Sequence, residues 1–389
     1  MATDSGALRR FLFVVLAVVF TSAAFHALGL LGAPLQIVYS DTLGFYERAA
    51  SPGYPYIGKN IEYPVLTGVF IDAMARIGGS RPGYYAATSV FLAAFAAVIA
   101  WLLWRMTPAD GRGRLRRYFA FAPSLFVFAA YNWDLLALLF VVAAFYVMER
   151  RRFAAAAFFL ALGFSAKFYP VIYFLPLWLA QSSWKERGKT LAIFAATAIA
   201  VNLPFLLANT EGWSYFFTLN SARNANPDSI WTIVRFFFRG LEVPAINAIS
   251  LSLFVGGYGW ALWRFRGAAE RGLVAASRPA PALWLCFLGT LILLLTNKVF
   301  SPQYILWLLP FFVLLPAVTR WQFYALEGAN LAALFFILPW FFLGKDIFYF
   351  YLASPFVLAR HVVLVILLIA AVRTLSRREQ EYLKPKPAA

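Results

Sequence analysis

The stretch EYPVLTGVFIDAMARI, residues 62–77, decides how this chain is arranged. It is apolar enough to form a helix, yet it contains Glu62, Asp72 and Arg76. Charged side chains are costly inside a membrane, and a spanning helix needs about 20 apolar residues. If the stretch crossed a membrane, the basic segment 105–117 would lie outside, against the usual distribution of charge. We therefore predict a helix that lies along the outer membrane surface.

The rest of the chain is strongly apolar, and this sets the fold class. Of 389 residues, 62% are hydrophobic and 13% are charged, and the mean hydropathy is +0.72. A soluble domain could not cover so much apolar surface, so we predict an all-α polytopic membrane protein. The first apolar run, 11–31, is too long for the core of a cleaved signal peptide, and we expect it to be retained as a helix.

Apolar segments of spanning length recur along the chain and predict about twelve transmembrane helices, within a range of about ten to thirteen. They are expected at 10–31, 84–104, 117–131, 134–149, 153–167, 169–181, 189–208, 243–263, 281–297, 303–319, 323–343 and 356–373. We expect one transmembrane domain, 1–373, followed by a polar cytoplasmic tail, 374–389. The first outer loop is then 32–83. No convincing internal repeat is present, which counts against an inverted-repeat transporter.

The net charge of +17 is distributed in a way that indicates a membrane rather than nucleic acid. Lysine and arginine cluster in short segments between apolar runs, at 112–117, 150–152, 185–189, 264–278 and 373–378. The positive-inside rule places such clusters in the cytoplasm, so we expect both termini there and the chain in the plasma membrane. The single cysteine, Cys286, and only two histidines argue against a disulfide framework and against a Cys/His metal site.

Asp41 is the first candidate for chemistry, in the sequence YSDTLGFY directly after the first apolar run. A carboxylate among aromatic residues at a membrane edge is partly desolvated, which raises its pKa and suits it to proton abstraction. The alternative is that Asp41 is the N-cap of a short helix, and both roles could hold together.

The remainder of the first outer loop is rich in tyrosine and stiffened by proline. Such a loop could stack on sugars or hold a lipid headgroup, whereas the alternative is an ordinary interfacial aromatic belt. The residues expected to contact a substrate here are Tyr46, Tyr56, Lys59, Glu62 and Tyr63.

Polar residues also lie at the outer ends of later spans. Asn132 and Asp134 are further candidates for substrate binding, and Gln303 follows Pro302 at a predicted helix start. Lys167 and Lys298 are ammonium groups at membrane depth, where an anion such as phosphate would be a suitable partner. Snorkelling to the interface is the alternative.

Three ionisable residues fall inside predicted spans. Burying an ionisable side chain in a membrane is energetically unfavourable, so Glu327, Arg360 and His361 each need a partner or a function there. Glu327 could pair with Arg360 as a structural ion pair. Alternatively, Glu327 and Arg360 could line a path together with Lys298 in a transporter or lipid flippase of cell-envelope assembly, or the chain could be a non-catalytic membrane scaffold.

The order of the motifs resembles a known superfamily. From residue 39 to about 310 the chain contains YSDTLGFY, EYPVL, YNWD, AKFYP and NKVFSPQYILWLLP in succession. This succession resembles the GT-C superfamily of integral-membrane glycosyltransferases, in particular bacterial polyprenyl-phosphate-mannose-dependent α-mannosyltransferases. The last two motifs are also similar to segments of the first mannosyltransferase of glycosylphosphatidylinositol assembly.

The resemblance implies a function and a site. It implies transfer of a sugar from a polyprenyl-phosphate donor to a lipid or glycan hydroxyl at the extracytoplasmic face, by a single inverting displacement. Asp41 would be the base, and Lys167, Lys298 or Arg223 would bind the donor phosphate. Some relatives have a second acid in an Asp-x-Asp pattern, whereas this chain has Leu43 there. We therefore expect no metal and no cofactor.

Overall fold

The computed structural model describes residues 2–272, 281–344 and 347–383, and in these ranges the elements are helices without a β-strand. Residues 384–389 of the predicted tail lie outside the described residues. Six of the described helices are long and apolar enough to cross a membrane. They are α1 (Ala2–Ala27), α6 (Arg81–Met106), α12 (Trp184–Ala208), α15 (Val243–Gly272), α18 (Arg320–Phe342) and α19 (Ile347–Leu383). The predicted class, an all-α polytopic membrane protein, is confirmed.

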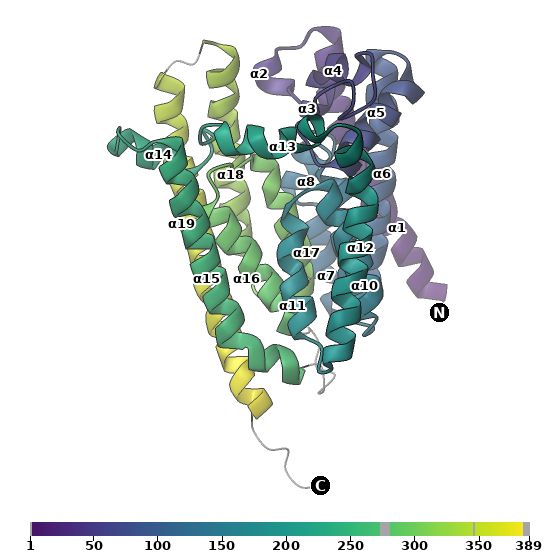
Figure 1. Cartoon of the computed structure of the whole chain (residues 1–389), viewed down its shortest axis with the longest axis vertical. Coiled ribbons are helices and arrows are strands. Elements are labelled where there is room, and N and C mark those ends of the chain that lie inside the picture. Colours follow the sequence, from purple (N-terminus) through teal and green to yellow (C-terminus); the bar gives the residue numbers. More distant parts are fainter. Residues whose placement is uncertain (1, 273–280, 345–346, 384–389) are drawn as a thin grey trace.

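Shorter apolar helices complete the bundle (Figure 1). Three are regular helices, namely α9 (Asp134–Met148), α10 (Phe153–Ala166) and α16 (Pro281–Thr296). Two others begin as 3₁₀ turns, η4 (Tyr169–Tyr173) and η5 (Pro302–Leu308), and continue as α11 (Phe174–Leu179) and α17 (Leu309–Leu314). A 3₁₀ helix rises about 2.0 Å per residue and an α-helix about 1.5 Å, so these composite segments reach farther than their lengths suggest.

Two predicted boundaries differ from the structure. The segment predicted as one span at 117–131 consists of a π-helical turn, η3 (Arg116–Ala120), and a short helix, α8 (Pro123–Phe128). Pro123 begins α8 because proline fits the first position of a helix but not its interior. At the other end of the chain, α19 continues to Leu383, so the region predicted as a tail from 374 begins as helix.

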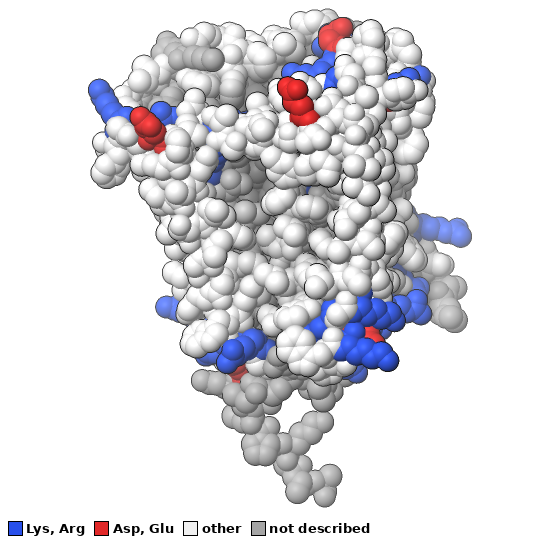
Figure 2. Space-filling model, in the orientation of Figure 1, with Lys and Arg blue, Asp and Glu red and all other residues white. Residues whose placement is uncertain are grey.

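Charged side chains are concentrated near the two ends of the bundle. In the view of Figure 2, lysines and arginines gather toward the end of the bundle where α19 finishes, and a broad white belt separates them from the opposite end. The acidic residues seen in this view lie mostly at that opposite end. An apolar belt between two charged ends is the distribution that a bilayer requires.

The segment predicted as the first outer loop forms four helices at the end of the bundle opposite the one where α19 finishes (Figure 1). They are α2 (Leu35–Val38), α3 (Asp41–Gly44), α4 (Tyr46–Ala50) and α5 (Val65–Gly78). The helix expected at 62–77 is therefore present as α5. Phe70 of α5 packs against α6, with its ring centroid 5.7 Å from that of Phe95. The orientation of α5 along a membrane surface stays a prediction.

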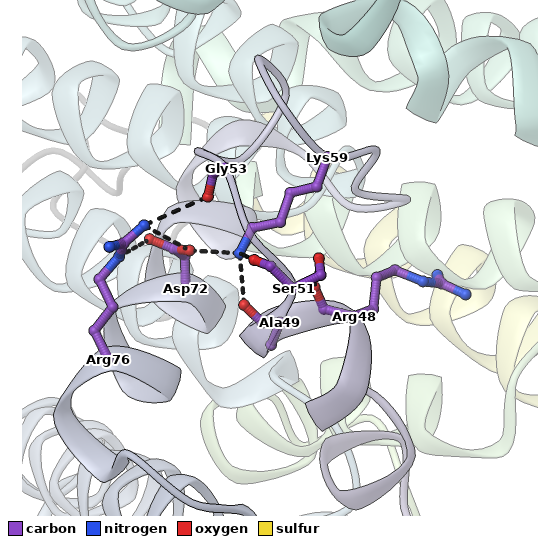
Figure 3. Close-up of polar contacts among 7 residues, drawn as sticks. All are labelled: Arg48, Ala49, Ser51, Gly53, Lys59, Asp72 and Arg76. Carbon is purple, nitrogen blue, oxygen red and sulfur yellow. Dashed lines mark hydrogen bonds and ion pairs between the residues drawn. The ribbon is translucent and has the colours of Figure 1, made fainter.

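An ion-pair cluster fixes the loop between α4 and α5 (Figure 3). The Nζ atom of Lys59 lies 2.7 Å from Asp72 Oδ1 and donates to the carbonyl oxygens of Ala49 at 2.5 Å and Ser51 at 3.1 Å. Arg76 Nε donates to Asp72 Oδ2 at 2.7 Å. The loop is thus tied to α5 at one buried point, and this arrangement sets the position of the residues on either side of it.

Candidate active site

A cavity of about 770 Å³ lies where the first outer loop meets the ends of the later helices. Its wall combines polar and apolar side chains from segments far apart in sequence. Most of the residues predicted to form a site line this cavity, namely Asp41, Glu62, Tyr63, Asn132, Lys167, Arg223, Lys298 and Gln303. The sequence prediction therefore corresponds to one place in the structure.

Asp41 is the first residue of α3 and lies half-buried in the cavity wall. The N-cap of α3 is Ser40, whose Oγ accepts from the backbone N–H of Leu43 at 3.3 Å, so the alternative role of Asp41 as a cap is wrong. Asp41 Oδ1 accepts from the hydroxyl of Tyr39 at 2.8 Å, and Oδ2 accepts from Asn132 Nδ2 at 2.6 Å. These two bonds fix the carboxylate at the cavity wall.

The surroundings of Asp41 favour a role as a base. Burial raises the pKa of its carboxyl group, and the hydrogen bonds from Asn132 and Tyr39, together with the charge of Lys167, oppose that rise without cancelling it. Each carboxylate oxygen has two lone pairs, so both can accept a further hydrogen bond from a ligand in the cavity. A carboxylate with a raised pKa, within reach of a bound hydroxyl, can act as a general base.

Asp134 lies behind the cavity wall and holds Lys167. Asp134 is fully buried, and its Oδ1 accepts from Lys167 Nζ at 2.6 Å and from Trp307 Nε1 at 2.7 Å. The ring of Trp307 is stacked between Tyr169 and Tyr304, with centroid distances of 3.9 Å and 4.0 Å. Asp134 was predicted to contact a substrate, but the structure gives it the role of positioning the Lys167 ammonium beside the cavity.

Lys298 and Arg223 form the second cationic part of the wall. The Nζ atom of Lys298 donates to the carbonyl oxygens of Ser221 at 3.1 Å and Arg223 at 2.8 Å. Arg223 is exposed, and its Nη2 donates to Asn226 Oδ1 at 2.8 Å. Burial lowers the pKa of the Lys298 ammonium, and the neighbouring charge of Arg223 lowers it further. The two cations are close together, and an anion in the cavity would relieve their repulsion.

Besides Asp134, three predicted site residues do not line the cavity. Tyr56 is 1% exposed and donates to the carbonyl oxygens of Tyr63 at 2.8 Å and Pro64 at 2.9 Å. Lys59 is engaged by Asp72 as described above, and Tyr46 packs against Tyr84 with ring centroids 5.6 Å apart. Their expected contact with a substrate is replaced by a structural role, because each side chain stabilises the loop that carries Tyr63.

Glu62 and Gln303 lie in the cavity wall with different surroundings. Glu62 forms an ion pair of 2.9 Å with Arg48, and its side chain remains 34% exposed. Gln303 is 5% exposed and lies in η5, and within the described part of the chain its Oε1 has no hydrogen-bond partner. A buried amide oxygen without a partner is costly, so a ligand hydroxyl in the cavity would be a favourable partner for Gln303.

Asp228 is a cavity residue that the sequence did not single out among the outer-loop acids. It is 4% exposed, and Arg360 Nη2 donates to its main-chain oxygen. Burial raises the pKa of the Asp228 carboxyl group to about 6, although the charge of Arg360 opposes this. Arg360 Nη1 also donates to Asn330 Oδ1 at 2.9 Å.

The possible pairing of Glu327 with Arg360 is wrong. Glu327 instead accepts from the backbone N–H of Ser124 at 2.8 Å and from its hydroxyl at 2.7 Å, at the start of α8. Glu327 and Arg360 are 1% and 0% exposed. Both side chains are thus buried with partners on other elements, and neither lines the cavity.

The part of the cavity away from the charged residues is apolar. It is lined by Leu251 and Phe254 of α15 and Leu293 of α16, and also by residues of α18. Those of α18 are Leu334, Ile337, Leu338, Phe341 and Phe342. A ligand that combines an anionic or hydroxylated head with a long apolar chain would match this division.

A family comparison agrees with these features. The family model of glycosyltransferase family 87 matches residues 83–293, slightly more than half of the chain. The comparison with curated proteins found no match. The matched range contains Asn132, Lys167 and Arg223 and ends before Lys298. The chain therefore belongs to glycosyltransferase family 87, a family of GT-C-type membrane glycosyltransferases, and the resemblance stated from the motifs is confirmed at this level.

Proposed function

We propose that this family 87 glycosyltransferase moves a mannose residue from polyprenyl-phosphate mannose to a hydroxyl of a lipid or glycan acceptor. The reaction would take place at the extracytoplasmic face of the plasma membrane. The observation that carries the proposal is the composition of one cavity, in which a half-buried Asp41, the cations Lys167, Arg223 and Lys298 and an apolar wall occur together.

The proposed mechanism is a single displacement. Asp41 takes the proton of the acceptor hydroxyl, and the acceptor oxygen attacks the anomeric carbon of the donor sugar. The bond between that carbon and the phosphate oxygen breaks, and polyprenyl phosphate leaves with the bonding electrons. Attack from the face opposite the leaving group inverts the anomeric configuration. Cations placed where negative charge develops lower the barrier of such a reaction.

Arg223 is the strongest candidate for the phosphate contact. The charge of Lys167 is compensated by Asp134 at 2.6 Å, and Lys298 Nζ already donates to two carbonyl oxygens. A guanidinium has five N–H donors in a planar arrangement that suits phosphate, and Asn226 receives a bond from Nη2. We therefore assign the principal phosphate contact to Arg223 and a supporting electrostatic role to Lys298.

The test of the proposal is Asp41→Asn in membranes supplied with radiolabelled polyprenyl-phosphate mannose and native lipid extract. Loss of the proton acceptor should reduce sugar transfer by roughly 10²- to 10⁴-fold. Asp110→Asn is the matched control, because Asp110 is an exposed acid outside the cavity wall. Unchanged transfer by Asp41→Asn would remove Asp41 as the base, and transfer only from another lipid-linked sugar would replace mannose as the donor sugar.

A separate experiment tests which side of the membrane the cavity faces. Cys286 is 1% exposed, so its reaction with thiol reagents in the folded protein should be slow. A cysteine in place of Ile77, which is 65% exposed in α5, should react with an impermeant thiol reagent added outside intact cells. Arg114→Cys should be protected under the same conditions. The reverse pattern would place the cavity on the cytoplasmic side.

A further inference from the structure

We propose that Asp228 binds hydroxyl groups of the sugar that is transferred, and so acts as a second substrate-binding carboxylate in the cavity. This inference rests on the proposed function. Its starting observation is that Asp228 lines the cavity, is 4% exposed, and has no hydrogen-bond partner at Oδ1 among the residues that the structure describes. Arg360 Nη1 lies 3.7 Å from that oxygen, beyond hydrogen-bonding distance.

Asp228 lies next to the proposed phosphate site. The side chain of Asn226, two residues earlier, accepts from Arg223 Nη2 at 2.8 Å, and its backbone N–H donates to the carbonyl oxygen of Lys298 at 3.1 Å. Asn226 Nδ2 also donates to the carbonyl oxygen of Phe300 at 3.1 Å. The segment that carries Asp228 is therefore fixed against the same residues that would hold the donor phosphate.

Asp228 and Asp41 line the same cavity, and Tyr131 is another residue of its wall. The ring of Tyr131 contacts that of Tyr39 edge to face, with centroids 5.7 Å apart, and Tyr39 donates to Asp41. A sugar attached to the phosphate and presented to Asp41 would therefore lie in the same cavity as the Asp228 carboxylate.

The chemistry of Asp228 selects the part of the donor that it can bind. An ionised carboxylate accepts hydrogen bonds but donates none, so it would repel phosphate and attract sugar hydroxyls. Arg360 fixes the main chain at Asp228 and is itself held by Asn330, whose Nδ2 donates to the carbonyl oxygen of Pro302 at 2.9 Å. Arg360 is thus a positioning residue, and the carboxylate remains available to a ligand.

The experiment measures binding to the purified full-length protein in detergent. Wild type should bind polyprenyl-phosphate mannose more tightly than polyprenyl phosphate. Asp228→Asn should lose roughly 10-fold or more of this preference, the usual effect of a hydrogen bond to a charged group, with unchanged affinity for polyprenyl phosphate. Arg223→Ala should instead weaken the binding of both lipids, and Asp110→Asn should change neither.

Deoxy forms of the donor identify which sugar hydroxyl binds Asp228. One of the 2-, 3-, 4- and 6-deoxy analogues of polyprenyl-phosphate mannose should bind wild type more weakly, and Asp228→Asn should be insensitive to that deletion. If Asp228→Asn does not fold, the double variant Asp228→Asn/Arg360→Gln, which also removes the buried positive charge, is measured instead.

Two kinds of result would contradict the role of Asp228 or the proposed donor. Retention of the sugar preference by the Asp228 variant, or additive effects of the variant and the deoxy donor, would reduce Asp228 to a structural ion-pair partner. Failure of wild type to bind either lipid would overturn the proposed donor itself. The two failures are therefore distinguishable.

Discussion

The ion-pair cluster of the first outer loop gives a sharp prediction about stability. Lys59 and Asp72 have side-chain exposures of 6% and 12%, and their charged atoms are 2.7 Å apart. Asp72→Asn would leave the Lys59 ammonium buried without a counter-charge. Breaking a buried pair in this way costs about 3–5 kcal/mol, because the remaining charge is neither solvated nor compensated.

Arg76 provides a matched control on the same carboxylate. It lies four residues after Asp72, and its own side chain is 57% exposed. Exposed ion pairs contribute little to stability, so Arg76→Gln should change the free energy of unfolding far less than Asp72→Asn does. The double variant Lys59→Met/Asp72→Asn should be more stable than Asp72→Asn alone, since the unpaired charge that remains, that of Arg76, is exposed.

The assay is equilibrium unfolding of the purified protein in detergent, combined with limited proteolysis of the loop between α4 and α5. Burial alone would raise the pKa of Asp72, but its bonds with Arg76 and Lys59 hold it below the usual value. The stabilisation is therefore present above the pKa of the unfolded state, about 4, and is lost as pH falls through the lower folded value. Equal effects of Asp72→Asn and Arg76→Gln, or additivity of the Lys59 and Asp72 changes, would refute the reasoning.

Three further predictions concern a hydrogen bond to the base, the N-cap of α3 and a close backbone contact at Gly212. Asn132→Ala removes a hydrogen bond that lowers the pKa of Asp41, so the acid limb of the activity–pH profile should move to higher pH; a shift to lower pH would contradict this. Ser40→Ala removes the N-cap of α3 and should cost about 1 kcal/mol in unfolding free energy, with a fall in kcat. Gly212→Ala would place Cβ 1.9 Å from the carbonyl oxygen of Tyr56 and should destabilise the protein by about 1–3 kcal/mol, measured by thermal unfolding against the open position Gly188→Ala.

Part of the fold and site was predictable because it depends on local composition. The long apolar runs gave the membrane class, and the charges within 62–77 set that segment apart from them. Asp41 could be chosen because an acid directly follows the first run. Its contact with Asn132, 91 residues later, could not be predicted from spacing, since it depends on how α3 packs against the turn before α9.

The partners of the buried charged residues were predicted least well from the sequence, and the reason is physical. A buried charge pairs with whatever the adjoining surface presents, and that depends on the rotation of each helix about its axis. Glu327 therefore meets Ser124, and Arg360 meets Asp228. Lys59 was taken as a substrate contact because an outer-loop ammonium attracts anions. The anion that it meets is Asp72 in the same loop, brought close by the turn that precedes α5.

The position of Leu43 bears on whether a metal takes part. Residues two apart on a helix point in nearly opposite directions. Asp41 lines the cavity, whereas Leu43 is 5% exposed and packs with Ala23, Tyr85 and Ala130. A second acid at this position would therefore face the apolar core instead of the substrate.

The corresponding prediction is that Leu43→Asp will not create a metal site. It should destabilise the protein by at least about 2 kcal/mol, because a carboxyl group would be buried without partners. Metal ions should not restore its activity, and treatment of wild type with EDTA should leave sugar transfer unchanged, since Arg223, Lys298 and Lys167 already supply positive charge at the cavity. Two results would contradict this prediction: a metal-dependent gain of activity in Leu43→Asp, or a loss of wild-type transfer in EDTA that added metal reverses. Either result would show that departure of the phosphate needs a metal ion that these three cations cannot replace.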